Sequence, residues 1–117
     1  MAAVSYNPVI DQGADWYINF TYYTDTTQTT PVNLTGYTAA MQFRSLPSDT
    51  VAALSLTTGS GITITGASGL VAVHATSAQT GSMGAGKYYY DLEITSPSGI
   101  VTRLAQGQAN VNAQVTR

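Results

Sequence analysis

The stretch Gly86–Thr95, which reads GKYYYDLEIT, decides the fold class. Its side chains separate by parity into an apolar set (Tyr88, Tyr90, Leu92, Ile94) and a set that is mostly polar (Lys87, Tyr89, Asp91, Glu93, Thr95). Successive side chains of a β-strand point to opposite faces, so this alternation predicts one buried and one solvated face. We expect this stretch to be the central strand of a two-layer β fold.

The segment that follows is expected to pair with this strand. Ser96–Gly99 reads SPSG, which is typical of a tight turn, and Ile100–Asn112 returns along the same direction. Gly107 interrupts the alternation of the returning segment, and an isolated glycine in a strand usually marks a bulge. The sequence therefore predicts a long hairpin with a bulge at Gly107.

Upstream segments show the same short, alternating pattern, separated by turn residues. The expected strands are Val4–Ile10 (an edge strand, because Pro8 lacks an N–H), Asp15–Tyr23, Thr38–Ser45, Val51–Thr57, and a hairpin of Ile62–Thr65 with Leu70–His74. Ser77–Met83 is the one expected helical turn, with Ser77 as N-cap and Gly81 as stop. We predict one all-β domain over residues 1–117, an antiparallel two-sheet sandwich of about seven to eight strands, with a small barrel as the alternative. Residues 1–14 form an arm or edge strand, and residues 113–117 form a tail.

Composition narrows the classes of partner. Charged residues make up 9% of the chain, against about 25% in ordinary domains, and the net charge is −2. No basic stripe is present, so we expect no nucleic-acid binding. No apolar run is long enough to span a membrane, and the N-terminus lacks a signal-peptide pattern. So few charges suit a protein packed against something else, and the alternative is a threonine-rich surface solvated by hydroxyl groups.

Few side chains suggest catalysis, and we predict no catalytic, cofactor or metal site. His74 is the single histidine and falls on the solvated parity of its strand, as a surface polar group would. Asp91 and Glu93 share one strand face about 7 Å apart, a spacing that could suit glycoside hydrolysis. Charge pairing across the hairpin with Lys87 and Arg103 is the simpler interpretation.

Tyrosines are the most informative surface feature, because they combine apolar area with a polar tip and are enriched at interfaces. Tyr17, Tyr23 and Tyr89 fall on predicted outer faces, where interface contact and ordinary sheet-surface packing are both open. The residues expected to contact a partner are Tyr6, Trp16, Tyr17, Tyr23, Tyr37, Tyr89 and Arg117. A place in the core is the alternative for Trp16.

Three stretches together resemble a known class of protein. They are Gly13–Tyr23, the corner and strand PVNLTGYTAAMQFR at residues 31–44, and Gly86–Thr95 with the following GIVTRL at residues 99–104. This layout resembles small virion proteins of tailed bacteriophages with an immunoglobulin-like sandwich. It is also similar to the amino-terminal domain of phage baseplate upper proteins, with Asn33 where Asp is usual. The resemblance implies no enzyme activity, catalytic residue or cofactor.

The resemblance gives the functional expectation. In the baseplate proteins a longer fibre region follows this domain, whereas here the chain stops at Arg117, so we expect a head decoration (cement) protein or a tail accessory protein. Expected partners are the major capsid protein or other virion proteins and sister copies, in a dimer or trimer. The expected location is the virion, assembled in the host cytoplasm and not secreted. A fibre-anchoring adaptor of the tail or baseplate is the first alternative, and a carbohydrate-binding module that takes a surface glycan is the second.

Overall fold

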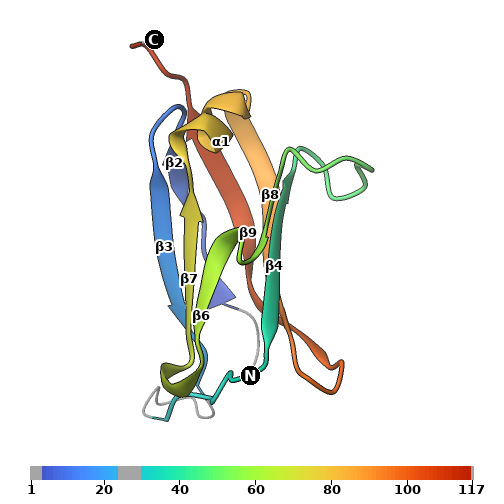
Figure 1. Cartoon of the computed structure of the whole chain (residues 1–117). Helices are drawn as coiled ribbons and strands as arrows, with labels where there is room; N and C mark the ends of the chain where they lie inside the picture. Colours follow the sequence, from blue (N-terminus) through green and yellow to red (C-terminus); the bar gives the residue numbers. More distant parts are fainter. Residues whose placement is uncertain (1–3, 24–29, 117) are drawn as a thin grey trace.

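Short strands connected by tight turns make up most of the computed structural model, which describes residues 4–23 and 30–116 (Figure 1). The strands are β1 Val4–Ser5, β2 Val9–Asp11, β3 Trp16–Thr21, β4 Thr38–Arg44, β5 Leu54–Thr58, β6 Gly61–Thr65, β7 Leu70–Ala75, β8 Gly86–Thr95 and β9 Val101–Asn112. Two short helical segments, η1 Gly66–Ser68 and α1 Ser77–Ser82, complete the described elements. The all-β prediction is confirmed and α1 was expected, whereas η1 was not.

The strands form one sheet that curls back on itself. Their order is β1-β9-β8-β4-β5-β6-β7-β3, and β2 also pairs with β9. Figure 1 shows β3, β7 and β6 on one side and β4, β8 and β9 on the other. The two layers expected of a sandwich are therefore present as halves of a single sheet. They are joined by β5, which pairs antiparallel with β4 and, through only two residue pairs, parallel with β6.

The expected antiparallel pairing holds for most neighbours but not at the N-terminus. The predicted edge strand Val4–Ile10 is split into β1 and β2, and both run parallel to β9. Between them the Tyr6 N–H donates to the Gln106 carbonyl at 3.0 Å, and the Asn110 N–H donates to the Pro8 carbonyl at 3.0 Å. Pro8 has no N–H to donate, so it sits where the ladder with β9 is already interrupted.

The β8–β9 hairpin is confirmed, but its bulge lies elsewhere than predicted. Gly107 stands opposite Tyr90 in regular register, and the register shifts between Leu92 and Glu93, which leaves Leu104 as the extra residue of β9. Gly107 is required for a different reason. A Cβ at this position would overlap the Tyr6 carbonyl oxygen, because the segment between β1 and β2 runs directly beside it. The glycine thus marks a close backbone approach, which is the other common meaning of glycine in a strand.

The core lies between the two halves and follows the predicted parity of β8. Tyr88, Tyr90, Leu92 and Ile94 are all buried, and the alternate residues of this strand are exposed or half-buried. Aromatic rings span the core: Trp16 of β3 meets Phe43 of β4 edge to face at 6.0 Å between centroids, and Phe43 stacks on Tyr90 at 5.5 Å. The first contact joins the two halves, and the second lies within one of them.

The N-cap of α1 lies one residue before the predicted cap. Thr76, not Ser77, is the N-cap, and it forms a reciprocal capping box with Gln79. The helix also continues past Gly81, which was expected to stop it, and ends with Met83 as C-cap. Strand β5 differs likewise, since it begins at Leu54 rather than Val51. No helix within residues 4–23 and 30–116 has the length and apolar character needed to cross a membrane.

Candidate functional site

The outer face of β4, β8 and β9 carries a regular grid of polar side chains. Strand register sets three residues side by side in each of three rows across these strands. From one end of the sheet to the other, the rows are Arg44–Tyr89–Gln108, Gln42–Asp91–Gln106 and Ala40–Glu93–Arg103. Side chains that are opposite on one sheet face are close enough to interact, so each row is a set of contacting neighbours.

The bulge in β9 completes the third row. Leu104 and Ala105 are adjacent in sequence, yet both are buried. The extra residue thereby shifts the parity of β9, so that Arg103 stands opposite Glu93. In an unbroken ladder Arg103 would instead stand opposite Ile94 and face the core. The bulge thus brings a guanidinium group to the outer face, as bulges near functional surfaces often do.

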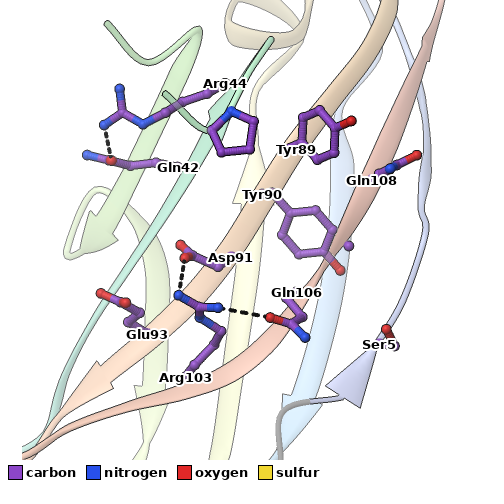
Figure 2. A pocket seen from close by; sticks show the side chains of 12 residues that line it. Ser5, Gln42, Arg44, Tyr89, Tyr90, Asp91, Glu93, Arg103, Gln106 and Gln108 are labelled. Atoms are coloured by element: carbon purple, nitrogen blue, oxygen red, sulfur yellow. Dashed lines mark hydrogen bonds and ion pairs between the residues drawn. The ribbon is translucent and has the colours of Figure 1, made fainter. Parts of the chain in front are cut away.

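Hydrogen bonds hold the grid side chains in place, as Figure 2 shows. Arg44 donates to the Gln42 Oε1 at 2.6 Å and to the Asp49 carbonyl at 2.9 Å. Arg103 donates to the Gln106 Oε1 at 3.0 Å and forms an ion pair with the Asp91 carboxylate at 3.4 Å. Each arginine is therefore anchored at two points, which restricts the rotamers of the neighbouring glutamines.

These side chains line an open hollow of about 560 Å³. The lining residues are Ser5, Gln42, Arg44, Pro47, Tyr89, Tyr90, Asp91, Glu93, Arg103, Gln106, Gly107 and Gln108. Asp91 and Glu93 belong to this lining because pairing with β4 and β9 places side chains on both sides of them. The expected charge pairing is present between Asp91 and Arg103, whereas Lys87 stands opposite Asn110.

A second outward surface lies on the other half of the sheet. The rings of Tyr17 and His74 stack face to face, 4.2 Å apart between centroids and 5° from parallel. The His74 Nε2 is 3.2 Å from the Asp15 Oδ2, and the Asp15 Oδ1 accepts the Ser77 N–H at 2.7 Å. His74 lies on the outer face, as the alternation of β7 predicts. A smaller hollow of about 350 Å³ borders this stack.

Strand β3, which carries Tyr17, ends the sheet and leaves a backbone edge open among the described residues. The Tyr22 N–H donates to the Gly69 carbonyl at 2.9 Å, so the backbone N–H of Tyr22 points toward β7. Because antiparallel ladders alternate, Tyr17, Asn19 and Thr21 direct their N–H and C=O groups away from β7. An incoming strand could pair with these three residues.

Of the seven expected contact residues, the six that the structure describes do not lie together. Tyr17 is 66% exposed, whereas Tyr89 lies half-buried on the opposite half of the sheet. Trp16 and Tyr37 pack against the core, so the alternative given for Trp16 is the one observed. Tyr6 is exposed between β1 and β2, Tyr23 is half-buried beside Pro31, and Arg117 lies outside the described residues.

Sequence reasoning missed the polar partners that complete the grid, namely Gln42, Arg44, Gln106 and Gln108. Their parity was visible in the sequence, since each alternates with apolar neighbours along its strand. That β4 is the other neighbour of β8 was not visible. Within residues 4–23 and 30–116, no three His, Asp or Glu side chains group closely enough to bind a metal ion. No protein-family model matches the sequence, and comparison with curated proteins finds no match.

Proposed function

We propose that this protein is a non-enzymatic structural component of a bacteriophage virion, and that it decorates and stabilises the assembled capsid shell. Two lines of reasoning support the proposal. The first is the resemblance of residues 13–23, 31–44 and 86–104 to small immunoglobulin-like virion proteins. The second, which carries the mechanism, is the outer edge of β3, which no other described strand pairs, with the exposed ring of Tyr17 beside it.

The β3 edge supplies the contact in this mechanism. An extended segment of the major capsid protein pairs with the outward N–H and C=O groups of Tyr17, Asn19 and Thr21, a recognition mode known as β-augmentation. Tyr17 then packs its ring against the added strand. Each backbone hydrogen bond contributes about 1 kcal/mol net, so one site binds weakly.

Many copies on one shell make such weak contacts sufficient. A decoration protein that also touches its sister copies gains effective concentration, which raises the overall affinity without any new kind of contact. The charged fraction of 9% favours this arrangement, because neighbouring copies repel one another little. Sister-copy contacts would fall on the exposed apolar residues, such as Ile100 and Val101 at the tip of the β8–β9 hairpin.

The experiment uses phage particles produced without this protein, to which the purified chain is added. Bound copies per particle are measured by sedimentation and gel densitometry, and their position is read by gold labelling in electron microscopy. Asn19→Pro removes an outward N–H of β3, while Asn19→Ala keeps that N–H and serves as the matched control. Tyr17→Ala tests whether the tyrosine ring contributes to binding.

Binding of wild type and Asn19→Ala over the whole shell, with loss in Asn19→Pro and weakening in Tyr17→Ala, is the expected result. Labelling confined to the tail would contradict shell decoration and favour the fibre-anchoring adaptor. A monomeric protein that binds no part of the particle would refute the virion proposal.

A further inference from the structure

The hollow over β4, β8 and β9 has a balanced set of charges. Its charged lining residues are two arginines, Arg44 and Arg103, and two carboxylates, Asp91 and Glu93, so the charges of +2 and −2 sum to zero. An anionic ligand would meet the two carboxylates, and a cationic ligand would meet the two guanidinium groups. The hollow therefore suits a ligand without net charge.

The same lining offers hydrogen-bond donors and acceptors in close alternation. Gln42 and Gln106 accept from the arginines through Oε1, and each keeps its amide NH₂ group as a donor. Glu93 adds acceptor oxygens, and Gln108 adds both kinds of group. A ligand whose polar groups can each donate and accept a hydrogen bond satisfies this pattern, and the hydroxyl is such a group.

Tyr89 provides the apolar part of the surface. It lies half-buried in the first row of the grid, between Arg44 and Gln108. An aromatic ring beside polar groups matches a ligand with an apolar C–H face and a hydroxyl-bearing rim. From Tyr89 to Glu93 the strand extends roughly 13 Å, which exceeds the width of one sugar ring and leaves room for a second.

The site is preorganised, which favours binding of a flexible ligand. The two arginines are held by Asp49, Gln42, Asp91 and Gln106, so ordering them costs little entropy when a ligand arrives. The side chains also stand on paired strands rather than on loops, which keeps their spacing fixed. Figure 2 shows the resulting arrangement around the two anchored arginines.

We propose that this hollow binds a neutral oligosaccharide, with Tyr89 against a sugar face and the glutamines and Glu93 bonded to its hydroxyl groups. The inference does not depend on the virion proposal, because the β3 edge belongs to the other half of the sheet. Either one can fail while the other stands.

The test is an NMR titration of the full ¹⁵N-labelled chain with linear hexasaccharides of glucose, mannose, xylose and N-acetylglucosamine. The glutamine side-chain amides and the backbone amides of β8 report the hollow. We expect at least one hexasaccharide to shift these resonances at concentrations up to about 10 mM, a range that covers weak single sites. Tyr89→Ala should weaken binding about tenfold, and Tyr17→Ala, on the other half of the sheet, should leave it unchanged.

A heparin-derived hexasaccharide and an acidic peptide complete the design as charged probes. The proposal is overturned if no neutral hexasaccharide shifts the resonances of the residues that line the hollow, or if only a charged probe shifts them. It is also overturned if Tyr17→Ala, rather than Tyr89→Ala, removes the shifts. Near-identical backbone spectra of both variants and wild type away from the substituted residues establish that each variant is folded.

Discussion

Tyr90 and Tyr6, which are 84 residues apart, are joined by a hydrogen bond of 2.7 Å from the Tyr90 hydroxyl to the Tyr6 carbonyl oxygen. The bond passes from the central strand β8 to the segment between β1 and β2, which runs beside β9. It ties the N-terminal segment to the core, at the same point where Gly107 allows that segment to approach. The N-terminal segment is therefore an integral part of the described fold.

Replacing Tyr90 by Phe should destabilise the protein by about 1 kcal/mol, because it removes this hydrogen bond and leaves the Tyr6 carbonyl without that donor. The ring and its stacking on Phe43 are retained. Urea denaturation monitored by circular dichroism measures the change. Tyr17→Phe, on an exposed ring, should change the stability by less than about 0.5 kcal/mol.

The same tyrosine predicts a dependence of stability on alkaline pH. Burial, with a smaller contribution from the nearby Tyr6, raises the pKa of Tyr90 from 10.0 to about 12. Above pH 10 the unfolded chain loses this proton while the folded chain keeps it, so stability falls with rising pH up to about 12. Tyr90→Phe should show a smaller fall over this interval than wild type. An equal fall in both proteins would contradict the assignment.

Gly107→Ala should destabilise the protein more than the addition of one methyl group would suggest. The added Cβ would overlap the Tyr6 carbonyl oxygen and lie 2.8 Å from the Asn7 Oδ1, so the backbone between β1 and β2 must move. We expect a loss of about 2–3 kcal/mol, together with faster amide exchange at Asn110 and Gln108, which bond to that segment. Gly84→Ala is the control, since its Cβ would have only an ordinary contact of 3.5 Å with the Tyr88 hydroxyl.

Thr80 is the one fully buried polar residue among those described, and its hydroxyl connects α1 to the turn before β3. It accepts the Gly13 N–H at 3.1 Å and donates to the Ala14 carbonyl at 2.8 Å. Thr80→Val removes both bonds without changing the volume, and we expect a loss of about 2–3 kcal/mol. Thr80→Ser keeps the hydroxyl and should lose only about 1 kcal/mol for its methyl group. Similar losses in both variants, measured by urea denaturation, would show that packing rather than hydrogen bonding matters here.

Local alternation was enough to place most of the strands and to predict the two faces of β8. The parity of β8 predicted which of its residues are buried, and the turn at Ser96–Gly99 predicted its pairing with β9. Both features depend on residues close together in the chain, and side-chain alternation in a strand has no competing geometry. The outward position of His74 and Tyr89 followed from the same rule.

Contacts between distant segments were decided only by the tertiary structure. The bulge at Leu104 arises from how β9 pairs with β8, and the glycine requirement at Gly107 arises from the close approach of the segment between β1 and β2. No local sequence pattern encodes either contact. The polar hollow likewise exists because β4 pairs with β8, which aligns Gln42 and Arg44 with the acidic residues. Strand order is set by which pairing buries the most apolar surface over the whole chain, so the sequence of any one strand does not contain it.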